Sequence, residues 1–135
     1  MTPDDWTYVE TRLRSLYSSV DLMCDGYRVT LTLRQVTPFK NAITVWVNGW
    51  LRGSWMSLES EEGRRFYPTH YRHYYRKAAR DSLKKMSKRS RELLAPDYDK
   101  KYTYKQPMWG SFKLMKKHII ENNEKIELVR GDDTP

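Results

Sequence analysis

The sequence has few of the residues that form disulfide bonds or bind structural metal ions. Among 135 residues it has one cysteine, Cys24, and three histidines. A single cysteine excludes an internal disulfide, and an ordinary four-ligand zinc site would have to borrow carboxylates. No apolar run reaches about 18 residues, and no charged-then-apolar leader opens the chain. We therefore expect neither a membrane-spanning nor a secreted protein, but a cytoplasmic one.

Motifs for catalysis are also scarce. The six glycines are scattered, and none belongs to a Gly-Lys-Ser/Thr phosphate loop. His70 and His73 are one turn apart on an expected helix, but their basic neighbours would repel a metal ion, which favours phosphate contact or a solvated helix start. Glu59, Glu61 and Glu62 cluster in an expected acidic loop over 58–63. We expect no enzyme activity, no catalytic residues, no metal and no cofactor.

Positive charge and aromatic rings are abundant. The chain has 25 Lys and Arg against 17 Asp and Glu, a formal charge of +8, and 13% aromatic residues. Residues 64–117 contain 17 basic and four acidic side chains, whereas 1–63 and 118–135 are slightly negative. The length and the 39% hydrophobic content fit one domain over 1–135. We divide it into a helix plus meander at 1–63, a basic helical segment at 64–117 and a frayed tail at 131–135.

The first half predicts a helix followed by antiparallel strands. Thr2 and Pro3 favour a helix start, and the apolar spacing carries this helix to about Ser18. Strands are expected over 20–24, 27–33, 42–47 and 50–56. The pairs Asp25-Gly26 and Asn48-Gly49 favour hairpin turns because both tolerate positive φ. We predict an α+β fold with an N-terminal helix, an antiparallel meander of three to four strands, two C-terminal helices and a short final strand over 126–129.

Alternation in the second strand places four apolar side chains on the face that helices cover: Tyr27, Val29, Leu31 and Leu33. Three tryptophans have two interpretations. In the interpretation that we favour, at least two of them complete the core. In the other, they form an exposed aromatic patch on the open face of the sheet, and this patch binds a protein. These protein-interface candidates are Trp46, Trp50 and Trp55.

Residues 67–95 are predicted to form one long amphipathic helix. Its apolar stripe would contain Tyr71, Tyr75, Ala79, Leu83, Met86 and Leu93. The opposite side is almost purely cationic, and only Asp81 interrupts it. Like charges one turn apart repel, which suggests that an anionic partner neutralises them. An ordinary solvated helix face is the alternative.

A loop rich in tyrosine and lysine is expected between Pro96 and Pro107, as a mobile arm that orders on a ligand. Ser111 is expected to cap a last helix. Cations interleaved with aromatic rings suit a phosphate backbone with unstacked bases. The candidate nucleic-acid contacts are Arg72, Arg76, Lys77, Arg80, Lys84, Lys88, Arg91, Lys100, Lys101, Lys105, Tyr98, Tyr102 and Tyr104.

The strand sequence ITVWVNG at 43–49 and the helical sequence RKAAR at 76–80 are similar to those of a double-stranded-RNA-binding domain. That family has the order α-β-β-β-α, and cations at the start of its last helix touch phosphates across the major groove. The resemblance covers residues 3–94 and implies a stand-alone RNA- or DNA-binding module. The long acidic segment, the missing Gly-x-Gly-x-Ser and the longer helix depart from the family.

The stretches DGYRVTL at 25–31, VNGW at 47–50, WGSFK at 109–113, NN at 122–123 and IEL at 126–128 resemble those of small accessory proteins of bacteriophages and mobile elements. Some of these proteins are anti-CRISPR or other anti-defence inhibitors. The resemblance implies a compact, non-enzymatic protein that binds a host nucleic-acid machine. Because this chain is basic, we expect it to engage the nucleic acid of such a nucleoprotein complex or an acidic protein patch. The sequence leaves the type of nucleic acid and the oligomeric state open.

Overall fold

A computed structural model describes residues 1–130, so the predicted frayed tail at 131–135 lies outside the described residues. The chain forms two compact units. We call residues 1–68 together with 105 onward the sheet unit, and residues 69–104 the basic unit. The predicted α+β class is confirmed. Folding as one domain stays a prediction, since compactness does not test independent folding. Among the described residues, no helix combines the length and apolar character needed to cross a bilayer.

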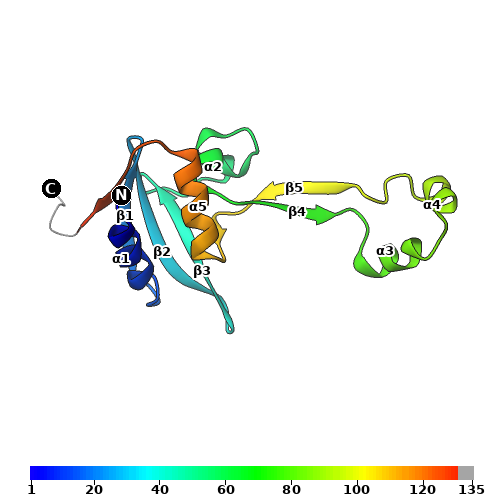
Figure 1. The fold of residues 1–135 in the computed structure, drawn as a ribbon, viewed down its shortest axis with the longest axis horizontal. Helices are drawn as coiled ribbons and strands as arrows, with labels where there is room; N and C mark the ends of the chain where they lie inside the picture. The colour runs from blue at the N-terminus through cyan, green and yellow to red at the C-terminus, as the bar shows by residue number, and fades with distance from the viewer. Residues whose placement is uncertain (131–135) are drawn as a thin grey trace. The chain divides into compact units, whose positions relative to one another are not determined.

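The sheet unit is built on a five-stranded antiparallel sheet with the order β6-β3-β2-β1-β7 (Figure 1). Its strands are β1 Ser19–Cys24, β2 Tyr27–Thr37, β3 Lys40–Val47, β6 Met108–Trp109 and β7 Ile126–Val129. The meander of the first three strands and the short final strand are therefore confirmed. The final strand pairs with β1 at the edge of the sheet.

Both predicted hairpin turns are present. Asp25 and Gly26 have φ of 49° and 89°, and Asn48 and Gly49 have φ of 51° and 81°. These left-handed conformations are the ones that Asn, Asp and Gly tolerate best. The return strand predicted over 50–56 is wrong, because Trp50 makes a single bridge to Val47 and a 3-10 helix, η1 Gly53–Met56, follows. The glycine at its start is a poor strand former.

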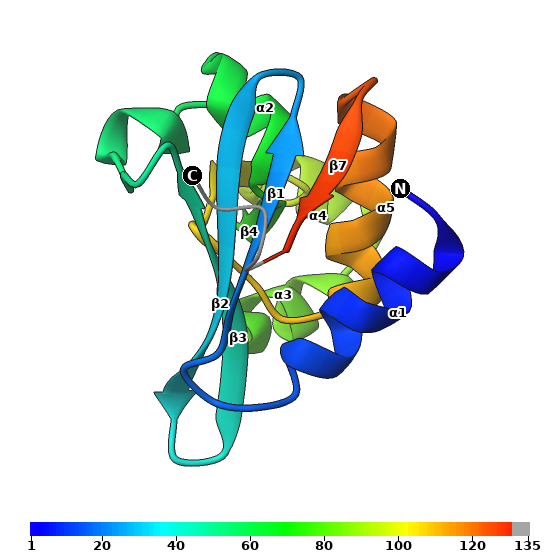
Figure 2. The same ribbon diagram turned by 90° about the vertical axis from the view of Figure 1, so that its left-hand side faces the viewer.

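Two helices cover one face of the sheet, α1 Pro3–Arg12 and α5 Phe112–Asn122 (Figure 2). The predicted caps are confirmed: Thr2 Oγ1 accepts from the amide of Asp5 at 3.1 Å, and Ser111 Oγ accepts from the amide of Leu114 at 3.3 Å. The first helix ends at Arg12 rather than near Ser18. The chain turns there to enter β1, with φ of 62° at Tyr17.

The core lies between these helices and the sheet. Leu31 stands opposite Val20 on β1 and Val45 on β3, so the buried side chains line up across the strands. The core residues include Trp6, Val9, Leu13, Leu22, Val29, Leu31, Val45, Phe66, Tyr67, Met115 and Ile119. Of the four predicted core positions in β2, Val29 and Leu31 are fully buried and Tyr27 and Leu33 are half-buried.

Cys24 also faces this core. Its side chain is buried, and burial raises the pKa of the thiol to about 12. A thiol with so high a pKa is protonated at neutral pH and is a poor nucleophile. Cys24 therefore serves as a small core side chain.

The expectation that two of three tryptophans complete the core is wrong. Trp46 lies on the sheet face opposite the buried one, where its indole N–H donates to Thr32 Oγ1 at 3.2 Å. Trp50 is 61% exposed, and Trp55 is half-buried against Tyr67. The buried tryptophans are Trp6 and Trp109. They occupy the core because α1 and β6 place them on the covered face, which periodicity around the NG turn does not reveal.

The acidic loop predicted over 58–63 instead begins a helix, α2 Glu61–Phe66, capped by Ser60. Glutamates at its N-terminus and arginines in its last turn match the helix dipole, which explains the acidic run.

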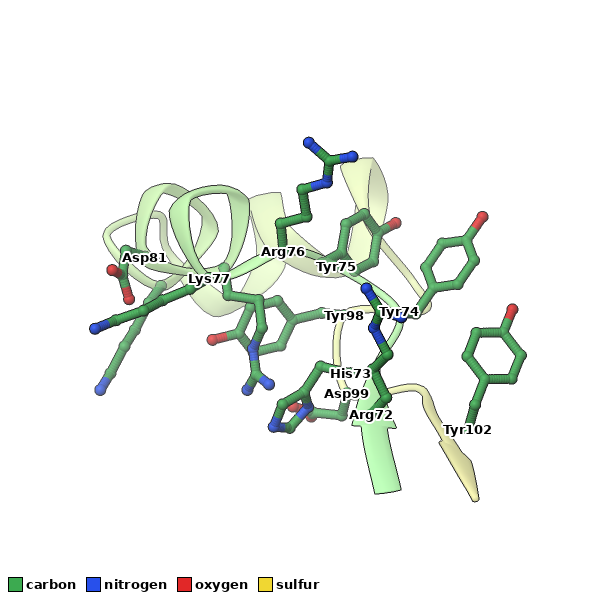
Figure 3. Close-up of a pocket in the computed structure, with 12 residues that line it drawn as sticks. Arg72, His73, Tyr74, Tyr75, Arg76, Lys77, Asp81, Tyr98, Asp99 and Tyr102 are labelled. Atoms are coloured by element: carbon green, nitrogen blue, oxygen red, sulfur yellow. The ribbon is translucent and has the colours of Figure 1, made fainter. Parts of the chain in front are cut away.

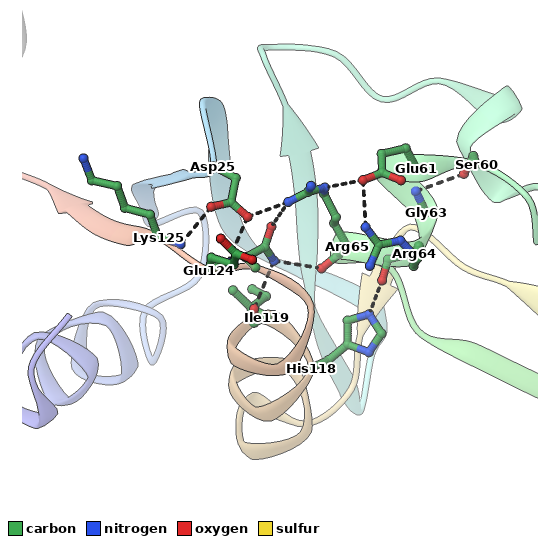
Figure 4. A network of polar contacts seen from close by, with 11 residues as sticks. Asp25, Ser60, Glu61, Gly63, Arg64, Arg65, His118, Ile119, Glu124 and Lys125 are labelled. Carbon is green, nitrogen blue, oxygen red and sulfur yellow. Dashed lines mark hydrogen bonds and ion pairs between the residues drawn. The ribbon is translucent and has the colours of Figure 1, made fainter.

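An ion network joins this helix to the β1–β2 turn and to the chain after α5 (Figure 4). Arg65 donates to Asp25 at 2.6 Å, to Glu61 at 2.7 Å and to the side-chain oxygen of Asn123 at 3.0 Å. Asp25 also accepts from the amides of Glu124 and Lys125. These backbone hydrogen bonds, followed by the one from Arg65, lower the pKa of Asp25. Its role is therefore structural.

The single helix predicted over 67–95 is wrong. The basic unit instead consists of β4 Thr69–His73, α3 Lys77–Lys84, α4 Lys88–Leu94 and β5 Lys101–Lys105, whose last residue belongs to the sheet unit. Pro68 disfavours a helical conformation at the residue before it, and the threonine and aromatic residues that follow favour a strand. Ser87 then caps α4 and separates it from α3. The predicted loop over 96–107 likewise contains β5.

Strands β4 and β5 form a two-stranded sheet and run in opposite directions (Figure 1). We call this pair the β4–β5 ribbon. The helices α3 and α4 follow β4 and precede β5. Of the predicted apolar stripe, Tyr71 is 59% exposed and Leu93 is 76% exposed. The basic unit therefore has no apolar stripe that faces a core.

Candidate functional site

The basic unit concentrates the positive charge of the protein. Residues 69–104 contain 11 Lys and Arg and four Asp and Glu, a net charge of +7, which leaves +1 for the rest of the chain. Within this range, all of which the structure describes, no lysine or arginine forms an ion pair with a carboxylate. In the sheet unit, by contrast, Arg28, Arg64 and Arg65 are each paired with Asp or Glu. The positive charge of the basic unit is thus not neutralised by ion pairs with its own carboxylates.

Two short helices position most of these cations. On α3, Arg80 and Lys84 are one turn apart, and Arg76 stands at the N-cap. No side chain caps this helix and no acidic residue lies in its first turn, so its positive dipole end is not neutralised by the protein. Lys88 and Arg91 lie on α4.

Tyr98 connects the two helices. The guanidinium carbons of Arg80 and Arg91 lie 5.3 and 4.9 Å from the centre of its ring. At these distances a ring face attracts a cation. One half-buried aromatic side chain therefore holds cations from α3 and α4 close together, although they repel each other.

An open pocket of about 1120 Å³ lies within the basic unit. Tyr74 and Tyr102 lie together at one end and Lys77 and Asp81 at the other, with Tyr98 between them (Figure 3). The lining residues are Arg72, His73, Tyr74, Tyr75, Arg76, Lys77, Arg80, Asp81, Lys84, Tyr98, Asp99 and Tyr102. Five Lys and Arg against two Asp make its lining positive.

His73 reports on this electropositive environment. Its Nδ1 is buried and has no hydrogen-bond partner among the described residues. Burial lowers the pKa of His73, the positive charges of Arg80 and Lys101 lower it further, and Asp99 opposes them. The imidazole is therefore neutral at physiological pH unless an anion offsets these cations.

One face of the β4–β5 ribbon has a row of aromatic rings. Tyr74 and Tyr102 face each other across the strands with centres 5.8 Å apart, and His70 and Tyr104 do so at 5.7 Å. The ammonium group of Lys100 lies 5.4 and 5.6 Å from the first two rings. Tyr74, Tyr102 and Tyr104 are 50%, 49% and 40% exposed. We call these four aromatic side chains the ring row.

The structure brings together nearly all the predicted nucleic-acid contacts. Every one of them except Lys105 lies in the basic unit. Lys105 is half-buried in the sheet unit, where its ammonium group donates to the carbonyl oxygen of Tyr67 at 3.3 Å and burial lowers its pKa. Its position is that of a structural side chain.

Other expectations about the site need correction. His70 and His73 are not one helical turn apart but lie on opposite faces of β4, because they are three residues apart in a strand. The cations do not come from one side of one helix but from β4, α3, α4 and β5. Sequence reasoning also missed the roles of Tyr74 and Asp99. The alternation of tyrosine and cations in KYTYK at 101–105 was the available signal for a strand.

The proposed alignment with a double-stranded-RNA-binding domain is also wrong in its last helix. The RKAAR sequence begins α3 in the basic unit, whereas the helix that follows the three strands and covers the sheet is α5. Its opening, FKLMK at 112–116, lacks the run of cations that the resemblance requires.

Within residues 1–130 no group of three or more histidine, cysteine or acidic side chains is placed to hold a metal ion. The chain matches no protein family, no curated protein and no solved structure. The site is therefore defined by its own residues: unpaired cations, exposed tyrosines and a positive pocket.

Proposed function

We propose that this protein binds nucleic acid through its basic unit, either free or within a host nucleoprotein complex. The function is one of binding rather than catalysis. The observation that carries the proposal is that the lysines and arginines of residues 69–104 form no ion pair with a carboxylate, whereas Arg28, Arg64 and Arg65 of the sheet unit do. Phosphate groups supply the missing negative charge.

Packing does not explain these residues. Ala95 is the one buried residue of 69–104, so the tyrosines and cations there contribute no core. A surface that serves only solubility mixes positive and negative side chains, and it gains stability from ion pairs between residues one helical turn apart. The basic unit instead keeps Arg80 and Lys84 adjacent, which costs helix stability. This cost is recovered when an anion binds.

The chemistry fits a backbone-directed contact. Lysine and arginine neutralise phosphates without reading sequence, and the exposed tyrosines offer faces on which bases stack. The open pocket has both kinds of side chain in its lining. We therefore propose binding with little sequence preference. The resemblance to anti-defence proteins of phages stays a prediction, and a nucleoprotein complex would present the same phosphates.

The test is charge reversal on α3. Arg80→Glu/Lys84→Glu should weaken binding of a labelled oligonucleotide by about 100-fold at about 50 mM salt, because each lost phosphate contact removes a counterion-release contribution. Fluorescence anisotropy measures the affinity. Intact protein that binds neither single-stranded nor double-stranded DNA or RNA at this salt contradicts the proposal.

The matched control is Lys113→Glu/Lys117→Glu. These exposed lysines are also four residues apart, on α5 of the sheet unit, so this variant changes the net charge by the same amount. We expect it to retain most of the affinity. Equal losses in both variants would show that net charge alone, and not the basic unit, governs binding.

A further inference from the structure

We propose that the preferred ligand of the basic unit is single-stranded nucleic acid, with bases stacked on the ring row of the β4–β5 ribbon. This inference rests on the proposed function and narrows it. Nucleic acid in a duplex keeps its bases stacked on each other and offers phosphates but no free ring faces. Exposed tyrosines on a ligand-binding surface are of use chiefly where bases are unstacked.

The ring row is placed for this role. Alternate residues of a strand point to the same side, so Tyr102 and Tyr104 share a face of β5. His70 lies in β4, and Tyr74 directly follows this strand, where its amide donates to the carbonyl oxygen of Lys100 at 2.9 Å. The ring contacts across the strands show that both pairs lie on one face of the ribbon. Each of the three tyrosines keeps two-fifths or more of its surface exposed. Rings that completed a core would be covered.

The spacing along the ribbon suits bases. Two residues of a strand span about 6.7 Å, which is about twice the thickness of a stacked base. A base can therefore insert next to Tyr104 and another next to Tyr102 along an extended single strand. In a duplex, successive bases are separated by half that distance and cannot each meet a ring.

Phosphate contacts lie beside the ring row. Lys100 has its ammonium group next to Tyr74 and Tyr102, and these two rings also line the positive pocket. Arg72 and Arg80 line the same pocket. A strand whose bases stack on the ribbon thus carries its backbone toward cations that no carboxylate of the protein neutralises.

The experiment compares single-stranded and blunt duplex oligonucleotides of the same sequence, as DNA and as RNA, with the full-length protein. We expect single strands to bind at least about 10-fold more tightly. Tyr102→Leu/Tyr104→Leu should weaken single-strand binding by roughly 5- to 150-fold for each ring, whereas Tyr102→Phe/Tyr104→Phe, which keeps the rings, should stay within about twofold. The DNA and RNA arms identify the sugar that is preferred.

Tyr71→Leu is the matched control. Tyr71 is 59% exposed on the opposite face of β4, under the ammonium group of Lys101, so this change removes an exposed ring outside the ring row. It should leave affinity nearly unchanged. Duplex binding as tight as single-strand binding, or unchanged affinity in the leucine double variant, overturns this inference but leaves the proposed function standing. Absence of binding to every nucleic acid overturns both.

Discussion

The two units of this protein use aromatic and basic residues in opposite ways. In the sheet unit, Trp6, Phe66 and Tyr67 are buried, and Arg65 is held by Asp25 and Glu61. In the basic unit, tyrosines are exposed, and cations contact rings rather than carboxylates. The same residue types therefore build a packed core with paired charges in one region and an exposed surface of unpaired cations, the proposed binding surface, in the other. Composition alone does not separate these uses.

The difference also divides stability from binding. A two-stranded ribbon without a core is marginally stable by itself, whereas a five-stranded sheet covered by two helices buries enough apolar surface to fold. We infer that the sheet unit supplies most of the free energy of unfolding and that the basic unit supplies the affinity for the ligand.

Removing the basic unit should have the largest effect on binding. The amide of Gln106 donates to the carbonyl oxygen of Pro68 at 3.4 Å, so two glycines can replace residues 69–104 and join the sheet unit directly. We expect this deletion to reduce affinity for a single strand by more than about 100-fold. Circular dichroism and urea unfolding should still show a cooperative transition. An unfolded deletion variant would show that residues 69–104 belong to the folding core.

Matched leucine substitutions sharpen the comparison of stability. Leu22→Ala empties a fully buried position on β1 and should lower the free energy of unfolding by about 2–5 kcal/mol. Leu93→Ala on α4 removes a side chain that is 76% exposed and should change it by no more than about 0.5 kcal/mol. Urea denaturation measures both values. Similar decreases in the free energy of unfolding for the two variants would contradict the claim that the sheet unit supplies most of the stability.

Acid should destabilise the protein through the sheet unit, and this effect is the smallest of the three. Hydrogen bonds from Lys125, Glu124 and Arg65 hold the pKa of Asp25 below its ordinary value of 3.8. The resulting stabilisation is fully present above that value and is lost as pH falls through the lower pKa of the folded state. Asp25→Asn should therefore lower the unfolding midpoint at pH 7 and flatten its decline in acid.

The control for this titration is Asp97→Asn, which removes an exposed carboxylate of the basic unit that forms no ion pair. We expect its acid unfolding curve to follow that of the unchanged protein. If Asp25→Asn leaves the midpoint and its pH dependence unaltered, the network around Arg65 does not stabilise the fold.

Local signals predicted much of the sheet unit. The caps at Thr2 and Ser111 and the turns at Asp25-Gly26 and Asn48-Gly49 depend on near neighbours, and the structure contains all of them. The placement of the tryptophans was not predictable in this way, because burial of Trp6 and Trp109 depends on which face of the sheet α1 and α5 cover.

The basic unit was harder to predict in shape than in content. Its cations were identified from the sequence. Its shape was not, because Tyr71, Tyr75 and Ala79 have the spacing of one helical stripe, although Tyr71 lies in β4, Tyr75 follows that strand and Ala79 lies in α3. Pairing between β4 and β5 joins residues about 30 positions apart, and single-sequence periodicity does not see such contacts. The ring row depends on that pairing, so it emerged from the structure alone.

The most direct test of the central claim is the salt dependence of single-strand binding by the intact protein. Neutralisation of phosphates by the basic unit predicts that the logarithm of the association constant falls linearly with the logarithm of salt concentration, with a slope of about −3 or steeper, equivalent to four or more phosphates. A slope near zero, or no binding at low salt, would contradict the account.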